Sequence, residues 1–411
     1  MDQQPDISGA LKTPSQSTSP KSILILSSDT GGGHRSAAKA LENSFMNLHP
    51  HPGQVLVNIA RVLEDSSLIC NSMAGVYNYL LRHRQHWMKY YYSAIERFKP
   101  NESPMVLKST VKYGIHLLEK CCPDVIVSVH PMTQHFCANI LRKLGLIGKI
   151  PLYTVVTDPC AGFWSAWACD DVEQYFVAGE SARDELISFG VPAEKITISG
   201  MPVHSKFKPV SEAEKMALRD TMGLSPDQFT VFMNAGWIGG GNIPKIFEEM
   251  TQAHLDMQVV FLAGNNETLI QNAHELAQSA KFPVKVMGYS NEIENIMNAS
   301  DVMVSKLGGL TTFEAMACRL PVIADTITPP MPQEAQTVDF IQQTGAGLTL
   351  DNPRKIVSVV QSLMGSDQLT RMRHAATQYG QHGAADRIAQ QIFNYIASPF
   401  ENVGATILSP A

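Results

Sequence analysis

The chain has 411 residues, 44% of them hydrophobic and 17% charged, and its 32 Lys and Arg against 38 Asp and Glu give a formal charge of −6. This composition is typical of a globular protein, and the length favours two domains over one. The near balance of charges excludes the basic surface of a nucleic-acid-binding protein but not a local basic patch at a membrane.

The N-terminal segment is rich in Gln, Ser, Thr and Pro, so residues 1–20 are predicted to be a disordered tail and not a signal peptide. The seven cysteines show no CxxC pair and no regular spacing, which favours a reducing, cytoplasmic location over a disulfide framework or a zinc site. No run approaches the roughly 18 uninterrupted apolar residues of a spanning helix. The sequence therefore predicts a protein that touches a membrane at most.

From residue 21 onward, short apolar runs alternate with helical stretches, which indicates an α/β fold with parallel sheets and crossover helices. The predicted strands of the first half are 22–27, 55–59, 124–129, 152–156 and 175–177, with a helix over 34–48. An aromatic and basic insertion, residues 71–98, interrupts the alternation. The predicted strands of the second half are 230–234, 258–262, 284–286, 302–305 and 321–324, with a terminal helical region over 370–396.

Gly200, Pro202 and Pro209 give the stretch between the two series the composition of a linker. We therefore predict an N-terminal acceptor domain over residues 21–205, a C-terminal donor domain over 206–375, and a helical return and tail over 376–411. Two doubly wound, Rossmann-like sheets leave a cleft at the carboxyl ends of their strands, where such folds bind ligands. The loops after strands are therefore the candidates for function.

The loop after the first strand contains Gly31, Gly32 and Gly33, followed by His34 at the start of a helix. Glycines let the backbone approach a ligand closely, and a helix N-terminus offers free N–H groups to polar or anionic oxygens. His34 is placed to act as a base or to hold a reacting hydroxyl. The alternative is a tight turn in which His34 caps the helix locally.

Three more residues of the first half follow strands or their loops. His130 either lines the cleft or is a structural histidine. Asp158 is a general base, an orienting partner of His34, or the cap of a turn. Trp164 forms an apolar wall for an acceptor or packs in the core.

The loops of the second half are rich in glycine. After strand 230–234 come Gly236, Gly239, Gly240 and Gly241. Because these precede a helix, they form either a diphosphate cradle that needs no metal or a flexible turn. The backbone at Gly288 and Tyr289, after strand 284–286, is available to a flat heterocycle.

The most specific loop follows strand 302–305. Gly308 and Gly309 bring backbone N–H groups to a phosphate, Thr311 can donate as well, and Lys306 adds a cation. Glu314, one helical turn further on, can accept hydrogen bonds from both hydroxyls of a ribose. The pair Gln333 and Glu334 suits sugar hydroxyls, or forms the first turn of a solvated helix.

Taken together, these motifs resemble the nucleotide-sugar glycosyltransferases of the GT-B fold. The resemblance is to the monogalactosyldiacylglycerol synthases and processive diacylglycerol glucosyltransferases, and more distantly to the peptidoglycan N-acetylglucosaminyltransferase. Its carriers, in chain order, are SDTGGGHRSAAKAL from Ser28, TVVTD from Thr154, SGMPVHSKF from Ser199, KLGGLTTFEAM from Lys306 and PQEAQ from Pro332.

The resemblance implies an inverting transfer of a hexose from UDP-galactose or UDP-glucose to a lipid hydroxyl such as that of diacylglycerol, with no cofactor and no metal. A soluble acceptor, or a nucleotide-sugar-binding or epimerase-type relative, is the alternative. His34 would be the base or a contact to acceptor or donor phosphate, with Asp158 as the second base candidate.

The resemblance also assigns the donor site. Lys306, Leu307, Gly308, Gly309 and Leu310 would hold the diphosphate, Glu314 the ribose, the backbone at Gly288 and Tyr289 the uracil, and Pro332, Gln333 and Glu334 the hexose. His204 stands where the plant-type synthases carry Arg, which weakens a phosphate contact or makes it pH-sensitive.

The insertion carries Arg82, Trp87 and Tyr90 among further aromatic and basic side chains. Such a mixture suits a membrane interface with anionic head groups, although a core helix with a basic outer face has the same pattern. With a lipid acceptor, we expect a cytoplasmic, peripheral membrane protein.

Overall fold

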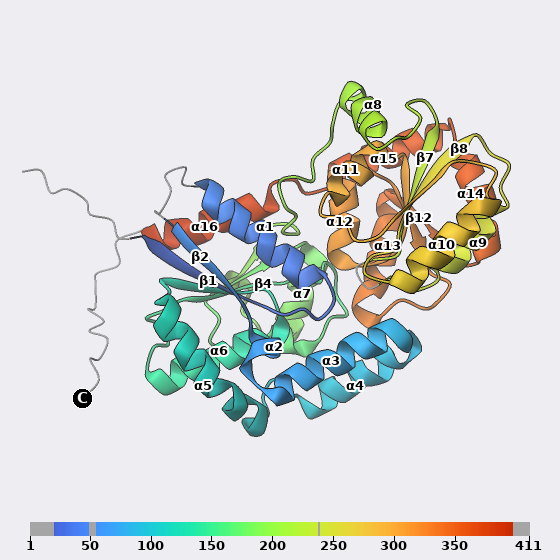
Figure 1. Ribbon diagram of the computed structural model, residues 1–411. Coiled ribbons are helices and arrows are strands. Elements are labelled where there is room, and N and C mark those ends of the chain that lie inside the picture. The colour runs from blue at the N-terminus through green and yellow to red at the C-terminus, as the bar shows by residue number, and fades with distance from the viewer. Residues whose placement is uncertain (1–19, 49–54, 237–238, 398–411) are drawn as a thin grey trace, which may run out of the picture.

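The computed structural model describes residues 20–48, 55–236 and 239–397. Figure 1 shows two α/β lobes, each with helices packed around a parallel sheet. All but the last residue of the tail predicted over 1–20, and residues 398–411 of the segment predicted over 376–411, lie outside the described part. No described helix is long and apolar enough to cross a membrane. All seven cysteines are free thiols.

The first sheet has the strand order β2-β1-β3-β4-β5-β6, with every pair parallel. Its strands are β1 (Lys21–Ser27), β2 (Val55–Arg61), β3 (Val125–Ser128), β4 (Leu152–Val155), β5 (Gln174–Val177) and β6 (Ile196–Ile198). The helices around it are α1 (Gly33–Leu48), α2 (Val62–Ser66), α5 (Pro104–Cys121), α6 (Pro131–Leu144) and α7 (Glu180–Ser188). The alternating residues of β1 enter two separate apolar cores, so both faces of this sheet are covered.

The second sheet has the order β12-β11-β10-β7-β8-β9, again wholly parallel. Its strands are β7 (Phe229–Asn234), β8 (Met257–Leu262), β9 (Val284–Met287), β10 (Val302–Lys306), β11 (Val322–Asp325) and β12 (Gly347–Leu350). Its helices are α8 (Glu212–Thr221), α9 (Ile243–Thr251), α10 (Glu267–Ser279), α11 (Ile293–Ala299), α12 (Gly309–Ala317), α13 (Pro332–Thr344), α14 (Ile356–Leu363) and α15 (Asp367–Tyr379).

Each sheet has one point where the strand order reverses. In the first sheet it lies between β1 and β3, and in the second between β7 and β10. At such a point, crossover connections leave in opposite directions and open a crevice at the carboxyl ends of the strands. The glycine loops that follow β1, β7 and β10 all lie at these two crevices.

The ten predicted strands are confirmed, and the structure adds β6 and β12, which the sequence analysis missed. β6 is a three-residue edge strand whose residues are all partly exposed, and β12 begins with a glycine, so neither shows a buried apolar run. The helical region over 370–396 is divided in two. Gly380 and the left-handed backbone at Gln381 and Gly383 separate α15 from α16 (Ala384–Ala397).

The first lobe is completed by one long-range helix contact and by one helical hairpin. The C-terminal α16 returns to the first lobe and packs beside α1, where Ser44 Oγ donates to Asp386 at 2.6 Å (Figure 1). The insertion forms a helical hairpin of α3 (Leu68–His83) and α4 (Met88–Phe98), whose inner faces meet through Tyr77 and Tyr91 at 5.7 Å between ring centroids.

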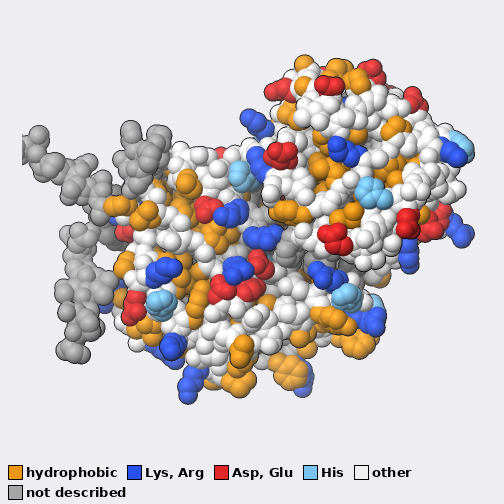
Figure 2. All heavy atoms as spheres, viewed as in Figure 1, with side chains coloured by type: hydrophobic (Ala, Val, Ile, Leu, Met, Phe, Trp, Pro, Cys, Tyr) orange, Lys and Arg blue, Asp and Glu red, His pale blue; other side chains and the backbone are white. Residues whose placement is uncertain are grey.

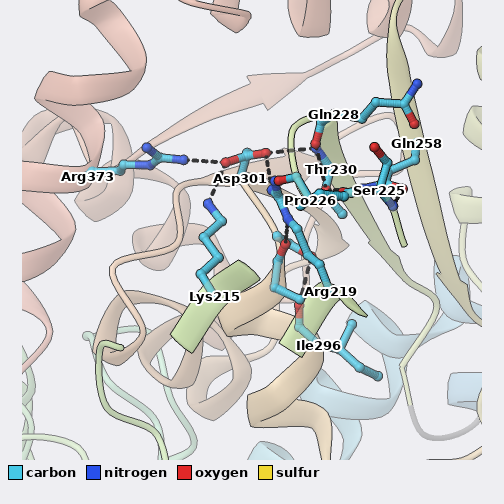
Figure 3. Close-up of polar contacts among 12 residues, drawn as sticks. Lys215, Arg219, Ser225, Pro226, Gln228, Thr230, Gln258, Ile296, Asp301 and Arg373 are labelled. Atoms are coloured by element: carbon cyan, nitrogen blue, oxygen red, sulfur yellow. Dashed lines mark hydrogen bonds and ion pairs between the residues drawn. The ribbon is translucent and has the colours of Figure 1, made fainter. Parts of the chain in front are cut away.

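One buried ion cluster joins α8, α15 and the start of β10 within the second lobe. Figure 3 shows the Asp301 carboxylate facing Lys215 and Arg219 of α8 and Arg373 of α15, at N···O distances of 2.6, 2.7 and 2.6 Å. The backbone N–H of Thr230 donates to the same carboxylate at 2.8 Å. Burial alone would raise the pKa of Asp301, but Lys215, Thr230 and Arg219 outweigh it and lower that pKa below its usual value.

We expect Asp301→Asn to destabilise the protein by about 3–5 kcal/mol, because it leaves buried cations without their counter-ion. Urea denaturation at pH 7 checks this, with Asp351→Asn, which removes an exposed partner of Lys355, as the control expected to change little. The folded pKa of Asp301 is lowered, so its stabilisation is present above its ordinary pKa and is lost as pH falls below about 4. An unchanged denaturation midpoint for Asp301→Asn would contradict the assignment.

Candidate active site

A cleft of about 600 Å³ runs between the lobes, and Figure 2 shows the surface hollowed there, with charged side chains nearby. The predicted site residues that line it are Gly31, Gly32, Gly33, His34, Asp158, His204, Gly236, Tyr289, Lys306, Gly308, Gly309, Leu310, Thr311, Glu314, Gln333 and Glu334. These residues come from both lobes and from five of the sequence motifs. The structure therefore brings most of the predicted site to one place.

A smaller cavity of about 90 Å³ adjoins the cleft, because His34, Asp158, Tyr77 and Gln333 line both. Its other walls are mainly apolar and aromatic and include His130 and Trp164. Much of the lining comes from α3 and α4. The inner side of the hairpin thus faces the residues predicted to be catalytic.

His34 is held in one tautomer by the loops around it. Its Nδ1 lies 2.8 Å from the carbonyl oxygen of Val129 and 2.9 Å from Thr157 Oγ1. A carbonyl oxygen can only accept, so Nδ1 carries the proton and Nε2 carries the lone pair. Burial lowers the pKa of His34 to about 4, with Val129 partly opposing the shift, so the ring is neutral at pH 7.

His130 belongs to the lining of the small cavity, and its ring is hydrogen-bonded on both sides. Its Nδ1 accepts the backbone N–H of Met132 at 3.2 Å and caps α6, and its Nε2 donates to Thr30 Oγ1 at 3.0 Å. Its ring meets that of His34 edge to face at 4.6 Å. Burial, and then the neighbouring His34, lower the pKa of His130 well below its usual value. Both nitrogens are thus used within the protein.

Asp158 does not orient His34 through Nδ1, because Val129 and Thr157 hold that atom. The carboxylate instead accepts the indole N–H of Trp167 at 2.7 Å. Burial raises the pKa of Asp158 to about 6, and the Trp167 hydrogen bond partly opposes this shift. Asp158 is therefore mostly ionised at pH 7 and remains exposed to the cleft.

The crevice of the second sheet offers a site for an anion. The first turn of α12 has no side-chain cap, so its N–H groups and the positive end of the helix dipole face the cleft at Gly308, Gly309 and Leu310. The stem of Lys306 lies against Gly236, where a Cβ atom would come within 3.1 Å of Lys306 Cε. This arrangement suits a diphosphate.

Gly309 has a second use that the sequence did not reveal. A Cβ atom there would approach Pro159 Cδ to 2.8 Å and the Thr157 carbonyl oxygen to 3.2 Å, both in the first lobe. Glycine at this position therefore lets the two lobes close onto one another beside His34.

Two carboxyl groups of the second lobe are half-protonated near neutral pH. Burial raises the pKa of Glu314 to about 7, with Lys206 opposing and Glu294 adding to the shift. Burial likewise raises the pKa of Glu334 to about 7, against the influence of Lys306. Both side chains line the cleft, where a buried carboxyl group can bind hydroxyls of a ligand.

Some predicted residues lie outside the lining of both cavities: Gly239, Gly240, Gly241, Gly288, Leu307, Arg82, Trp87 and Tyr90. The backbone at Gly239 packs onto the Ala263 carbonyl, and that at Gly288 onto Ile270. Leu307 is buried in an apolar cluster with Ala324 and Ile341. The hairpin residues Arg82, Trp87 and Tyr90 are exposed on its outer surface. Pro332 begins α13, and Trp237, which the sequence analysis noted, falls outside the described residues.

Several residues at the site were missed by the sequence analysis. Thr157 fixes His34, and its place directly before Asp158 in the same motif was the available signal. Asn78 of α3 accepts the Gly31 N–H and donates to the Asp29 carbonyl, each at 3.2 Å, and so holds the glycine loop. Tyr92 of α4 accepts a hydrogen bond from Gln333 of the other lobe.

His204 lines the cleft with its Nδ1 accepting the Lys206 N–H at 3.1 Å. Burial and the charge of Lys206 lower the pKa of His204 below its ordinary value. Lys206, itself in the lining, pairs with Glu294 at 2.7 Å. Within the described ranges, no group of three or more His, Cys, Asp or Glu is arranged to hold a metal ion.

The sequence matches the family profile of monogalactosyldiacylglycerol synthase over residues 34–203 and that of the group 1 glycosyl transferases over residues 242–365. A monogalactosyldiacylglycerol synthase of Spinacia oleracea is 30% identical over an alignment of 387 positions, which covers 91% of this chain and 72% of the spinach protein. The chain belongs to the monogalactosyldiacylglycerol synthase family. It is therefore a glycosyltransferase. A processive diacylglycerol beta-glucosyltransferase of Bacillus licheniformis is 26% identical over 353 residues, 85% of this chain and 88% of that protein.

Solved structures confirm the fold expected for this family. MurG of Acinetobacter baumannii superposes with a TM-score of 0.61 at 13% identity, covering 91% of this chain and all of MurG. Anabaena HepE, solved in complex with UDP-glucose, superposes with a TM-score of 0.56 at 15% identity, covering 92% of this chain and 99% of HepE. This family member has the GT-B fold, with α16 returning to the first lobe as predicted.

Proposed function

We propose that this family member transfers a hexose from UDP-galactose or UDP-glucose to the hydroxyl of a diacylglycerol-type lipid, with inversion at the anomeric carbon and without a metal. The observation that carries the proposal is the position of His34, which lines both the cleft and the small apolar cavity and whose Nδ1 is held by the Val129 carbonyl, so that Nε2 has the lone pair. The spinach and Bacillus relatives are named for lipid acceptors, and HepE was solved with UDP-glucose.

The proposed step is a single displacement. The acceptor hydroxyl gives its proton to His34 Nε2 as its oxygen forms a bond to the anomeric carbon, and the bond from that carbon to the phosphate oxygen breaks, releasing UDP. One base is enough for this reaction. Attack opposite the leaving group inverts the configuration.

The leaving diphosphate gains charge as the bond breaks, so the enzyme must stabilise an anion. The uncapped N-terminus of α12 and the ammonium of Lys306 supply fixed positive charge at the second crevice. The carboxyl groups of Glu314 and Glu334 would bind hydroxyls of the ribose and hexose. These groups together can replace the metal ion that many nucleotide-sugar enzymes use.

A radiolabelled transfer assay tests the proposal. The purified protein is mixed with diacylglycerol vesicles and EDTA, and is offered UDP-galactose, UDP-glucose or UDP-N-acetylglucosamine in turn. We expect label in the lipid with one of the first two donors and a glycoside of inverted configuration. Transfer only to a water-soluble acceptor, or only after Mg²⁺ or Mn²⁺ is added, would overturn the acceptor or the metal-free mechanism respectively.

We also propose that the outer surface of the α3–α4 hairpin rests on the membrane. Tyr79, Trp87, Tyr90 and Phe98 are more than half exposed there, and Lys89 lies over the Tyr90 ring at 4.9 Å. Figure 2 shows hydrophobic and basic side chains mixed over this part of the first lobe. Aromatic rings with nearby cations are the groups that bind at an anionic interface.

Replacing Trp87 and Tyr90 together by Ser is expected to weaken binding to anionic vesicles at least tenfold, because two inserted aromatic side chains lose their apolar burial. Co-sedimentation with vesicles checks this, and UDP affinity should not change, since both residues lie outside the cleft lining. Met216→Ser on α8 removes an apolar side chain that is 47% exposed on the other lobe and serves as the control. Equal losses in both variants would contradict the assignment.

A further inference from the structure

The amide of Gln333 has one end bonded within the protein and one end without a partner. Gln333 is the second residue of α13, is 7% exposed, and lines both the cleft and the small cavity. Its Nε2 donates to the hydroxyl oxygen of Tyr92 and lies 3.8 Å from the sulfur of Met331. Within the described chain, its Oε1 has no hydrogen-bond partner. A buried acceptor normally has a donor, so an unpartnered one beside a cleft indicates a ligand that brings a hydroxyl or an N–H.

Tyr92 reaches this amide from the other lobe. It lies on α4 of the first-lobe hairpin, whereas Gln333 belongs to the second lobe. Its ring packs edge to face against that of Tyr91, with 6.1 Å between centroids. Burial raises the pKa of Tyr92 well above its ordinary value, so the phenol is neutral and its oxygen accepts the amide proton. This hydrogen bond therefore joins the two lobes at the wall of the small cavity.

The contact with Tyr92 decides which end of the Gln333 amide a ligand meets. A glutamine side chain has several rotatable bonds, and its amide carries donors at one end and an acceptor at the other. Because Tyr92 occupies the donor end, the acceptor end is left for the ligand. Ordering such a side chain before the ligand arrives also removes an entropy cost from binding. Without the Tyr92 oxygen, the amide is free to turn.

We propose that Tyr92 is a positioning residue for the donor hexose, which holds the Gln333 amide from the first lobe so that Oε1 accepts a hexose hydroxyl. The inference rests on the proposed function and adds to it that the hairpin of the first lobe completes recognition of the donor sugar. The nucleotide needs no such contact, because Lys306 and the N-terminus of α12 both belong to the second lobe. Affinity for a UDP-hexose should therefore depend on Tyr92, and affinity for UDP should not.

The test compares UDP with its hexose esters. Calorimetry measures binding of UDP, UDP-galactose and UDP-glucose to the full chain, as wild type and as Tyr92→Phe. For the UDP-hexose that wild-type protein binds more tightly, we expect Tyr92→Phe to weaken binding about three- to tenfold, the effect of one hydrogen bond. UDP affinity should not change, and an unchanged value also shows that the variant is folded.

Two control variants separate this role from simpler ones. Tyr91→Phe removes the neighbouring hydroxyl on α4, which lines the same small cavity. Ser181→Ala removes another hydrogen bond between the lobes, from Ser181 Oγ to Gln336 Oε1 at 2.9 Å, outside the lining of both cavities. Both controls should keep the wild-type ratio of UDP-hexose to UDP affinity. An equal loss in Ser181→Ala and Tyr92→Phe would mean that the contact only holds the lobes together, and would overturn the inference.

A double-mutant cycle tests whether Tyr92 acts through Gln333. In a Gln333→Leu background, Tyr92→Phe should cause no further loss of UDP-hexose affinity. The same loss in both backgrounds, or wild-type binding by Tyr92→Phe alone, would overturn the inference. The transfer assay separates the two proposals. A hexose-specific loss in Tyr92→Phe without transfer to lipid refutes only the lipid acceptor, and transfer to lipid with unchanged donor binding in Tyr92→Phe refutes only the role of Tyr92.

Discussion

His34→Ala is expected to reduce hexose transfer by a factor of about 10²–10⁴, the contribution of a positioned general base. The physical reason is the loss of Nε2, which is free to accept a proton because Nδ1 is bound to Val129 and Thr157. UDP affinity should stay within tenfold of the wild-type value, because the groups proposed to hold the diphosphate lie in the other lobe. Transfer rates and calorimetry with UDP provide the two measurements.

Asp158→Asn tests whether His34 or Asp158 is the general base. If His34 is the base, this variant keeps a larger share of the activity than His34→Ala does. His116→Ala, which removes an exposed histidine on α5, should behave as wild type. Near-normal turnover in His34→Ala with a full loss in Asp158→Asn would instead make Asp158 the base.

The strands and the post-strand loops could be predicted from the sequence because both are local patterns. Buried apolar runs mark the interior strands of a parallel sheet, and glycine-rich turns mark the ends where ligands bind. The fold then brings these ends together, so residues as distant as His34 and Glu314 were placed in one cleft correctly.

The contacts that set the chemistry could not be predicted in this way, because they join residues far apart in the chain. The tautomer of His34 depends on the backbone carbonyl of Val129. Every residue has such a carbonyl, so the order of side chains in the sequence does not indicate this contact. Gln333 and Tyr92 lie 241 positions apart. The aromatic and basic pattern of the hairpin indicated an interface but not that its inner side, with Tyr77 and Asn78, faces the site.

Gly309 illustrates the same limit. The glycine pair at 308–309 indicated close approach of a phosphate, and the structure shows that at Gly309 the close approach is to Thr157 and Pro159 of the first lobe. A glycine in a loop indicates that another group approaches the backbone closely. Only the packed structure tells what it is.

Glu314→Gln is expected to raise the free energy of unfolding of the ligand-free protein above that of the wild type, and to do so more at pH 8 than at pH 5. The same substitution is expected to weaken UDP binding about 10- to 100-fold. Burial raises the folded pKa of Glu314 from 4.5 to about 7. Between these two values the folded state holds a proton that the unfolded state has released, so the stability of the wild-type protein falls as pH rises through this window. The buried carboxylate then costs up to about 3 kcal/mol at pH 8, and the neutral amide avoids this cost.

The loss of UDP affinity has a separate cause. A carboxylate accepts hydrogen bonds from both ribose hydroxyls, and such charge-assisted bonds contribute about 1.5–3 kcal/mol, whereas the amide has a single acceptor oxygen. Denaturant unfolding of wild type and variant at pH 5 and pH 8, with calorimetry of UDP at pH 8, measures both effects. Glu119→Gln, an exposed carboxylate on α5, should change neither.

The two readouts test different statements. An unchanged UDP affinity would remove Glu314 from the donor site even if the pH effect on stability is found. A stability difference that is the same at pH 5 and pH 8 would show that the carboxyl group ionises normally in the folded protein. Both effects together would mean that the buried Glu314 carboxylate destabilises the ligand-free protein and accepts hydrogen bonds from the bound nucleotide.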